Sequence, residues 1–168
     1  MAIEDHAPIV KSLIWPNEDQ TRAFAQALAQ RLQNAAPDFT ACIELRGDLG
    51  AGKTTLVRHL LKALGVQGRI KSPTYAVVEP YSVSTSSGRL LNIWHFDFYR
   101  FNDPDEWEEA GFRDIFASPG LKLVEWPEKA GAHLPPADLT VSLALAENDE
   151  RLVSLRAATA AGTFLLKP

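Results

Sequence analysis

The sequence predicts an α/β fold in three layers, α/β/α, with a mostly parallel sheet and antiparallel strands at the C-terminus. Two observations predict this class. Short apolar segments with the composition of strands alternate with amphipathic helical segments in the first part of the chain, as in proteins with parallel sheets. Near the C-terminus, the apolar segments 139–145 and 151–155 are joined by a polar turn, which favours an antiparallel pair.

A helix is predicted soon after the N-terminus. Asn17 can cap it, and Gln20 three residues later completes a weak capping box. Beyond the cap, apolar side chains recur at helical spacing: Phe24, Leu28 and Leu32.

The next predicted elements are a strand and a helix with a glycine-rich turn between them. Residues 41–46 predict a short strand, although Glu44 and Arg46 make it more polar than a fully buried strand. After the turn at 47–52, the predicted helix has one apolar face, made by Leu56, Val57, Leu60, Leu61 and Leu64. Gly65 stands where the C-terminal cap of this helix is expected.

The middle of the chain is rich in predicted strands. Residues 75–83 and 90–98 are predicted as two strands separated by the turn 84–88. The segment 103–106, Asp-Pro-Asp-Glu, predicts a helix start with an N-cap, a proline at the first helical position and a glutamate at the third. Residues 121–125 predict a further short apolar strand.

Composition limits the classes of protein to consider. A chain of 168 residues with 46% hydrophobic and 23% charged residues is typical of one soluble domain. The formal net charge of −4 argues against binding to RNA or DNA by the chain alone, because nucleic-acid binding normally needs a basic footprint. The sequence has no apolar run long enough to span a bilayer and no signal peptide, and Cys42 is its single cysteine, so we expect a cytoplasmic protein without an internal disulfide.

The glycine-rich turn carries a phosphate-binding pattern. Residues 47–54 fit G-x-x-x-x-G-K-S/T and lie between a predicted strand and an amphipathic helix, which is the context that the pattern requires. Glycines let backbone N–H groups turn toward phosphates, and the helix N-terminus favours an anion. Lys53 is expected to reach the outer phosphates and the Thr54 hydroxyl to ligate Mg²⁺. The chance alternative is a glycine-rich turn with an incidental lysine. We therefore predict a P-loop NTPase-like protein that holds a nucleoside triphosphate through Asp48, Leu49, Gly50, Ala51, Gly52, Lys53, Thr54 and Thr55.

Two carboxylates stand at the ends of predicted strands. Asp97 and Glu125 each follow an apolar segment, and ligands of open α/β sheets bind at the carboxyl ends of the strands. A P-loop enzyme needs a carboxylate near the magnesium ion and a group that orients the attacking water. Either residue alone could be a solvated strand terminus, but together with the phosphate loop they favour a hydrolytic site.

Other residues stay ambiguous at this level. A hydroxyl of the segment 72–74 could sense the γ-phosphate as switch loops do, although a proline turn explains the segment as well. His95 and Trp126 have the same ambiguity, since an isolated histidine or tryptophan is more often packed than catalytic. The acidic residues of 103–109 are most simply a solvated first turn of a helix, and their second interpretation is a partner surface.

Four motifs in this order resemble the TsaE family, the small bacterial ATPases of tRNA threonylcarbamoyladenosine biosynthesis. The first motif is common to all P-loop proteins, and the other three are specific in combination. The resemblance extends from about Asn17 to the C-terminal strands. The motifs are Gly-Asp-Leu-Gly-Ala-Gly-Lys-Thr-Thr at 47–55, Lys-Ser-Pro-Thr-Tyr at 71–75, His-Phe-Asp-Phe-Tyr-Arg at 95–100 and Val-Glu-Trp-Pro at 124–127.

The resemblance implies a role, partners and cofactors. Such proteins bind a TsaD–TsaB pair and hydrolyse ATP with Mg²⁺, which resets the pair between rounds of modification of the adenosine beside the anticodon. Matching of the motifs implies that Lys53 and Thr54 bind phosphate and magnesium, and that Thr74 belongs to the switch-like segment. It also implies that Asp97 and Glu125 share metal binding and water activation, with Glu125 favoured near the metal, and that Trp126 lies close to the nucleotide.

Two other functions remain open from the residues alone. A small-molecule P-loop kinase would carry a basic lid, and the sequence has no lid-like stretch after the phosphate loop. A regulatory module that holds nucleotide without turnover is the second alternative, against which Asp97 and Glu125 argue. A GTPase is disfavoured, because the sequence has no Asn-Lys-x-Asp motif.

Overall fold

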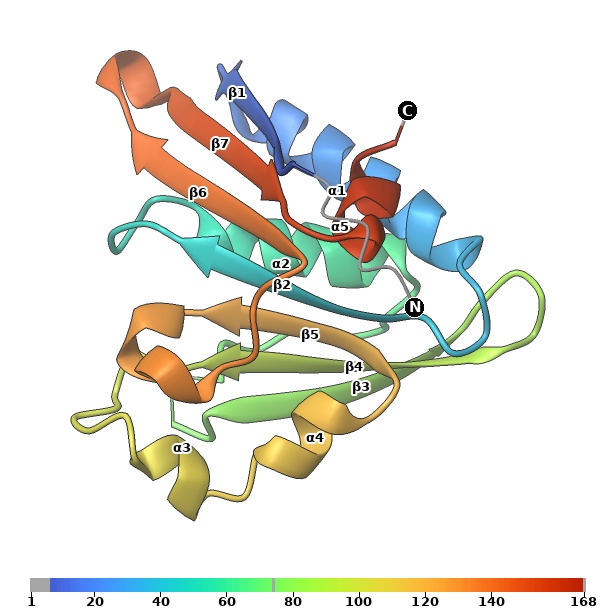
Figure 1. Ribbon diagram of the computed structural model, residues 1–168. Coiled ribbons are helices and arrows are strands. Elements are labelled where there is room, and N and C mark those ends of the chain that lie inside the picture. Colours follow the sequence, from blue (N-terminus) through green and yellow to red (C-terminus); the bar gives the residue numbers. More distant parts are fainter. Residues whose placement is uncertain (1–6, 74, 168) are drawn as a thin grey trace.

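The computed structural model describes residues 7–73 and 75–167, and within them seven strands form one mixed sheet (Figure 1). The order across the sheet is β1-β7-β6-β2-β5-β4-β3. The strands are β1 (Ile9–Trp15), β2 (Thr40–Arg46), β3 (Val78–Ser84), β4 (Leu90–Asp97), β5 (Gly120–Glu125), β6 (Leu139–Leu145) and β7 (Arg151–Ala157).

The four central strands, β6, β2, β5 and β4, run parallel. Antiparallel strands flank them, with β3 beside β4 at one edge and β7 and β1 beyond β6 at the other. The predicted α/β class and the antiparallel C-terminal pair are therefore confirmed. Because the central strands are parallel, their carboxyl ends meet at one edge of the sheet, where ligands of such folds bind.

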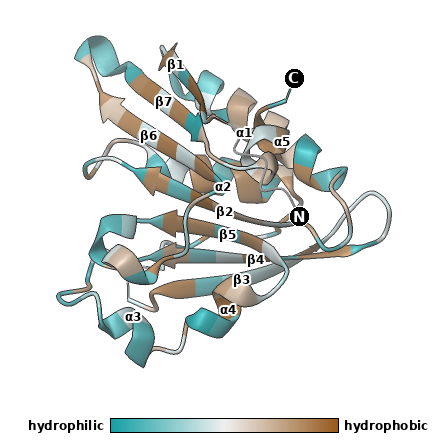
Figure 2. Cartoon of the chain, viewed as in Figure 1, coloured by the Kyte–Doolittle hydropathy of each residue, from teal (hydrophilic) through white to brown (hydrophobic). Residues whose placement is uncertain are grey.

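Helices cover both faces of the sheet, which gives the three layers. Alternate residues of β2 divide between two buried clusters: Ile43 packs with α1, α2 and α5, while Cys42 packs on the opposite face with α3 and α4. Figure 2 shows brown, apolar residues concentrated along the strands between these layers. The helices are α1 (Glu18–Gln33), α2 (Lys53–Ala63), α3 (Glu106–Glu109), α4 (Arg113–Ala117) and α5 (Ala160–Leu166).

Local sequence signals account for the two longest helices. The Asn17 side chain accepts a hydrogen bond from the Asp19 N–H at 2.9 Å, so the predicted N-cap of α1 is confirmed. α2 begins at Lys53, directly after the glycine-rich turn, and buries the predicted apolar face. Gly65 follows the end of α2 with a φ of 99°, in the left-handed region that favours glycine.

Some elements differ from the sequence-based expectation. β1, α4 and α5 were not predicted, and β3 begins at Val78, whereas the sequence predicted a strand from residue 75. The polar character of β2 has a local explanation. Glu44 is buried on the α3–α4 face, where its Oε2 accepts from the guanidinium of Arg46 at 3.0 Å.

Candidate functional site

The glycine-rich loop between β2 and α2 has the backbone of an anion-binding turn. Gly47, Gly50 and Gly52 all have positive φ, at 145°, 80° and 109°. Glycine is required at position 47, because a Cβ there would overlap the carbonyl oxygen of Leu143. α2 then begins at Lys53, so the unpaired N–H groups of its first turn and its dipole are available to a phosphate.

Lys53 points back into this loop. Its Nζ donates to the carbonyl oxygen of Gly47 and lies 3.4 Å from that of Asp48. The same ammonium sits 3.8 Å from the centre of the Trp126 ring, which is within cation–π range. Burial lowers the pKa of Lys53, and the nearby carboxylates, Glu125 first among them, oppose this shift. The cation is thus held by uncharged groups, two backbone carbonyls and an indole ring, that an anionic phosphate could replace.

Glu125 connects the loop to the centre of the sheet. Its carboxylate is almost fully buried at the end of β5. Oε1 accepts from the Thr54 hydroxyl at 2.7 Å, and Oε2 lies 2.6 Å from Nε2 of the buried His95. Because a carboxylate only accepts hydrogen bonds, His95 donates through Nε2. Three side chains from α2, β5 and β4 therefore form one hydrogen-bonded row, Thr54–Glu125–His95.

Asp97 lies beside Glu125, since the two are paired in register at the ends of β4 and β5. One carboxylate oxygen accepts from the Tyr99 N–H at 2.9 Å. Burial raises the pKa of Asp97, and the charge of Glu125 adds to this rise, while the Tyr99 hydrogen bond, His95 and Lys53 lower it. A raised pKa brings a carboxylate closer to the range useful for a general base.

Trp126 has an unusual backbone conformation. Its φ of 56° and ψ of 48° place a bulky residue in the left-handed region, which costs free energy and is often found at functional sites. This turn brings the ring against Lys53 and against Tyr99, with the two ring centroids 5.0 Å apart. The ring is half-buried: it packs against the apolar cluster on the α3–α4 face of the sheet and also forms one wall of the site.

These groups enclose a pocket of about 320 Å³. The structure thus brings together the predicted site residues that it describes. Thr74 lies outside the described residues, although Ser72 from the same predicted segment reaches the pocket. The lining consists of Asp48, Leu49, Gly50, Ala51, Gly52, Lys53, Thr54, Thr55, Ser72, Asp97, Tyr99, Glu125, Trp126 and Arg151.

The oxygen ligands at this pocket fit a magnesium ion. Among the described residues, no group of three or more His, Cys, Asp and Glu side chains is arranged to hold a metal by itself. Mg²⁺ does not need such a cage, since it usually takes one or two protein oxygens together with substrate phosphates and water. Thr54 Oγ1 and Glu125 Oε1 are adjacent, hard oxygen ligands beside the phosphate loop, and Asp97 is next to them in register.

Sequence reasoning left three residues of the site unassigned: His95, Tyr99 and Arg151. His95 had a detectable signal: it lies two residues before Asp97 on the same face of β4, which continues the buried positions Leu91 and Ile93. Arg151 had no local signal. It reaches across from the start of β7, where its Nε donates to the Ala51 carbonyl at 2.7 Å and one Nη to the Asp149 carbonyl at 2.8 Å.

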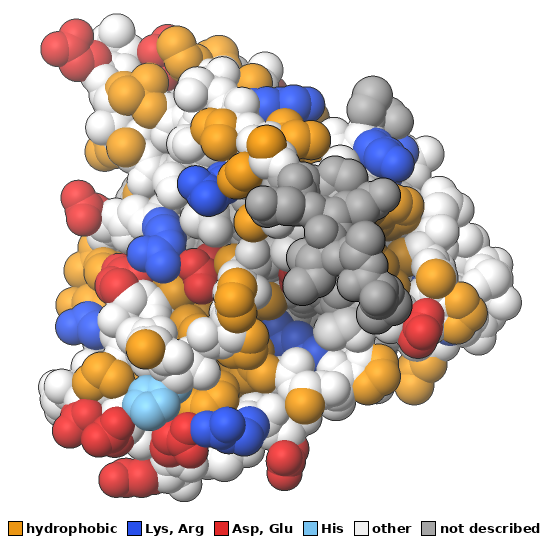
Figure 3. Space-filling model, viewed as in Figure 1, with side chains coloured by type: hydrophobic (Ala, Val, Ile, Leu, Met, Phe, Trp, Pro, Cys, Tyr) orange, Lys and Arg blue, Asp and Glu red, His pale blue; other side chains and the backbone are white. Residues whose placement is uncertain are grey.

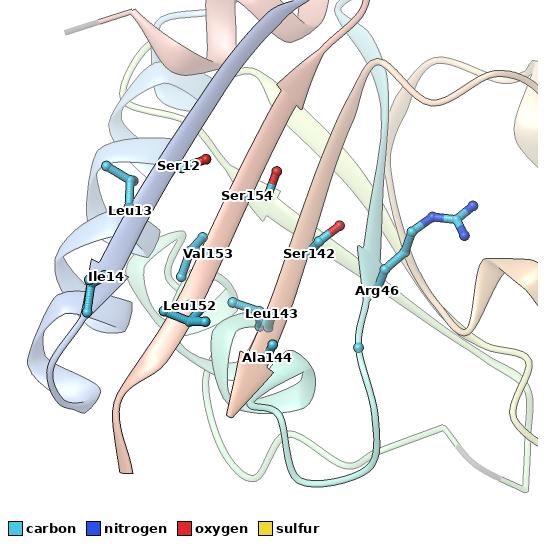
Figure 4. A pocket seen from close by; sticks show the side chains of 11 residues that line it. Ser12, Leu13, Ile14, Arg46, Ser142, Leu143, Ala144, Leu152, Val153 and Ser154 are labelled. Carbon is cyan, nitrogen blue, oxygen red and sulfur yellow. The ribbon is translucent and has the colours of Figure 1, made fainter. Parts of the chain in front are cut away.

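A larger hollow, of about 820 Å³, lies on the outer face of β1, β7 and β6. Ser12, Ser154 and Ser142 form a row across these strands (Figure 4), with Ile14 and Leu152 beside it. The hollow is shallow and mainly aliphatic, and none of the predicted catalytic or metal-binding residues lines it. Arg46 and Gly47 line the side of the hollow nearest β2.

The acidic segment after β4 lies on α3 and beside it. Figure 3 shows acidic side chains gathered around a histidine on this part of the surface. His133 Nε2 lies 2.9 Å from Asp105, and the guanidinium of Arg113 pairs with Glu108. Arg113 and His133 thus pair with two of the acidic side chains of this segment.

The fold and the loop together define a P-loop NTPase-like protein in which strand-end carboxylates face the phosphate-binding turn. The model of the family described as "Threonylcarbamoyl adenosine biosynthesis protein TsaE" matches residues 15–153. The chain belongs to this TsaE family.

Similar proteins cover nearly the whole chain. The tRNA threonylcarbamoyladenosine biosynthesis protein TsaE of Haemophilus influenzae is 41% identical over 151 residues, which are 90% of this chain and 92% of that protein. The protein of the same name from Bacillus subtilis is 33% identical over 150 residues, covering 88% and 87%. A crystal structure of YdiB from Bacillus subtilis superposes with a TM-score of 0.73 at 26% identity, covering 95% of this chain and 93% of that one.

In the part of the chain that the structure describes, no helix is long and apolar enough to cross a membrane.

Proposed function

We propose that this chain is a Mg²⁺-dependent ATPase that binds a TsaD–TsaB complex in a nucleotide-dependent way and supports repeated rounds of tRNA threonylcarbamoyladenosine synthesis. The observation that carries the proposal is the row of hydrogen-bonded side chains Thr54–Glu125–His95 beside the phosphate loop. A loop that only bound phosphate would not need the buried Glu125 carboxylate, which is hydrogen-bonded to Thr54. It would also not need Asp97, the second carboxylate, in register with Glu125.

The loop residues bind and orient the triphosphate. Backbone N–H groups of 47–55 surround the inner phosphates, and the Lys53 ammonium exchanges its contacts with the loop carbonyls for the outer phosphates. Thr54 and Glu125 would hold Mg²⁺, which when bound supplies positive charge against the charge that develops on the phosphate oxygens. Trp126 and Tyr99 close one side of the pocket and limit the access of water.

Asp97 is the proposed group that orients the attacking water and accepts its proton. Its carboxylate is buried at the end of β4, in register with Glu125, and lines the same pocket as the phosphate loop, which supports a place beside the attacking water. The raised pKa of Asp97 suits this role, because a stronger base accepts a proton more readily. Removing either carboxylate should therefore affect hydrolysis more than binding.

Action through a protein partner agrees with the charge of the chain. A net charge of −4 offers little general attraction for a polyanion, so tRNA should bind weakly to the isolated chain even at low salt. Nucleotide can control a partner only through contacts that differ between ATP and ADP. The segment around Ser72, at the mouth of the pocket, is the proposed element that responds to the γ-phosphate.

The test is reconstitution with TsaD and TsaB from the same source. ATP should favour the ternary complex over ADP, and repeated rounds of tRNA modification should require the chain with Lys53 intact. Lys62→Ala is the matched control, because Lys62 lies on the exposed side of α2, outside the pocket. Equal complex formation with ATP, with ADP and without nucleotide would contradict the switch, and tight tRNA binding by the isolated chain would contradict the indirect role.

A further inference from the structure

The carbonyl groups of the phosphate loop are held by two cationic side chains. When the N–H groups of a loop turn toward a phosphate, its carbonyls need donors elsewhere, because a carbonyl that leaves water without a hydrogen bond costs free energy. Lys53 donates to the Gly47 carbonyl and lies 3.4 Å from that of Asp48, in the first half of the loop. The second half is held by Arg151, whose Nε donates to the Ala51 carbonyl at 2.7 Å.

The guanidinium of Arg151 is fixed from the loop and from its own turn. One Nη lies 3.5 Å from the Gly50 carbonyl, and the other donates to the Asp149 carbonyl at 2.8 Å. Asp149 and Asn148 both have positive φ, at 60° and 59°, as in the tight turns that join antiparallel strands. The β6–β7 turn therefore holds the guanidinium in place without any ligand.

The sheet explains how a residue so far along the chain reaches the loop. Arg151 and Ala51 are 100 residues apart in sequence. Because β7 runs antiparallel to β6, it begins at the edge of the sheet where β6 and β2 end (Figure 1). The loop passes so close to β6 that a Cβ at Gly47 would overlap the Leu143 carbonyl, and a Cβ at Gly52 would lie 3.5 Å from Arg151 Nε.

The hydrogen bond to Ala51 also sets the direction of the next N–H group. The peptide unit between Ala51 and Gly52 is trans, so its C=O and N–H point to opposite sides. With the Ala51 carbonyl directed at Arg151, the Gly52 N–H points away from Arg151. Glycine tolerates many backbone conformations, so the sequence alone does not fix this peptide unit. Arg151 supplies the missing restraint directly before α2 begins.

Lys53 and Arg151 differ in what happens to them when a phosphate binds. The Lys53 ammonium exchanges its contacts with the loop for the outer phosphates, so the Gly47 carbonyl loses that donor. Arg151 can keep its acceptors, because they all belong to the backbone of the loop and of the β6–β7 turn. It is therefore the side chain that can hold the loop both before and during binding.

We propose that Arg151 is a positioning residue of the phosphate loop, which holds the Gly50 and Ala51 carbonyls outward so that the loop N–H groups face the phosphates. It acts through the backbone of the loop and makes no contact with the ligand. The inference rests on the proposed function, because it requires the loop to bind phosphates. A loop ordered in advance raises the affinity for any ligand that carries the phosphates, whatever is attached to them.

The test compares ATP with inorganic tripolyphosphate, which lacks the nucleoside, by calorimetric dissociation constants in Mg²⁺. Arg151→Met removes the donors, and Arg151→Lys keeps the charge without the planar fork. Arg156→Met is the matched control, because Arg156 is an exposed arginine of the same strand outside the pocket. Arg151→Met should weaken both ligands by the same factor, about tenfold or more. Arg151→Lys should stay about fivefold or more weaker than the wild type, and Arg156→Met should stay within about twofold of it.

Three results would overturn the proposal. Loss of ATP affinity with tripolyphosphate unchanged would mean that Arg151 contacts the nucleoside. Unchanged affinities in Arg151→Met would leave the residue without a role in binding. Full recovery in Arg151→Lys would show that only the charge matters.

Hydrogen exchange of the ligand-free chains separates positioning from a general loss of stability. The amides of 47–55 should exchange about tenfold faster in Arg151→Met than in the wild type, while those of β2 and β7 should not change. Equal acceleration throughout the sheet, or none in the loop, would contradict a local restraint by Arg151.

A further measurement uses the wild-type chain and does not depend on the folding of a variant. The Nε–H resonance of Arg151 should exchange slowly with water in the ligand-free chain and with tripolyphosphate bound, because the Ala51 carbonyl accepts from it in both states. Fast exchange in either state would overturn the proposal. A wild-type chain that binds neither ligand would overturn the proposed function instead, and the exchange of this resonance would still test the contact between Arg151 and the loop.

Discussion

Lys122 and Glu125 are both buried on β5, three positions apart, and they contact different parts of the molecule. Lys122, on the α3–α4 face, donates through Nζ to the Ser118 carbonyl at the end of α4, and the ammonium lies 5.3 Å from the centre of the Trp94 ring. Glu125, on the opposite face, holds side chains from α2 and β4 that converge on the phosphate loop. Burial is nearly complete for both residues.

The comparison shows that a buried charge does not by itself mark a functional site. Burial lowers the pKa of Lys122, as expected for a cation taken out of water, and a helix end provides its main hydrogen-bond acceptor. Its contacts join α4 to the sheet. The contacts of Glu125 instead join His95 of β4 to Thr54, which lines the pocket together with Glu125 and the loop. Lys122 and Glu125 are equally buried, and they differ in the residues with which they form hydrogen bonds.

The largest expected effect separates these two residues. Glu125→Gln and Asp97→Asn should each lower the rate of ATP hydrolysis by about 10²-fold or more, because both carboxylates are proposed to act on metal and water in the transition state. Lys122→Met should keep the hydrolysis rate of the folded protein within about twofold and lower the free energy of unfolding by about 1 kcal/mol, since the Ser118 carbonyl loses its donor. Steady-state hydrolysis and denaturant unfolding of the three variants measure this. Normal hydrolysis in Glu125→Gln would show that its contacts are as structural as those of Lys122.

A smaller effect is expected at His95, which acts through Glu125. Donation from His95 Nε2 to Oε2 leaves Oε1 directed to Thr54, so losing the donor should let the carboxylate turn away. His95→Leu should raise the Mg²⁺ concentration for half-maximal hydrolysis by about 10- to 100-fold, as is typical of residues that orient a metal ligand. His95→Gln retains a donor and should recover part of the loss. An unchanged Mg²⁺ dependence in His95→Leu, with the fold intact by circular dichroism, would make His95 a packing residue.

Trp126 should report nucleotide binding. Lys53 lies over its ring, and a nucleotide that draws the ammonium toward phosphate changes the surroundings of the indole. With the other three tryptophans replaced by phenylalanine, ATP should alter the emission of Trp126 measurably. A variant that binds ATP calorimetrically without any change in emission would show that the contact with Lys53 is the same with and without nucleotide.

The smallest expected effect is the slow chemical labelling of Cys42, which lies on the same face of the sheet as Lys122. Burial raises the pKa of the thiol to about 12, so the reactive thiolate is scarce in the folded protein. A thiol reagent at pH 8 should therefore label Cys42 at the rate of unfolding, and denaturant should accelerate the labelling. Fast labelling of the native chain would mean that this face of β2 is open to solvent.

Sequence patterns predicted the parts of the site that depend on local structure. The loop 47–55 is defined by its glycines and by the helix that follows, and Asp97 and Glu125 each end an apolar strand. The pairing of these two carboxylates depends on the register between β4 and β5, which neither strand specifies alone. The role of His95 depended on that same register. Arg151 required the packing of β7 against the loop, a contact across most of the chain.

The missed elements have similar causes. β1 has exposed apolar residues such as Val10 and Ile14, so its sequence lacks the clear alternation of a half-buried strand, and it is held by pairing with β7 near the other end of the chain. α5 is short and contains Gly162, where a Cβ would overlap the Asp138 carbonyl. Tertiary contact therefore stabilises it, together with the Thr159 cap, and helix propensity does not.

Calorimetric titration of ATP and Mg²⁺ into the wild-type chain and Lys53→Ala tests the central claim most directly. Lys53 is the first residue of α2 and belongs to neither apolar cluster, so its loss should leave the fold intact by circular dichroism. The account predicts saturable ATP binding by the wild-type chain and none detectable in Lys53→Ala, with Lys62→Ala binding as the wild type does. A folded Lys53→Ala variant with near-unchanged ATP affinity would contradict the assignment of the phosphate loop.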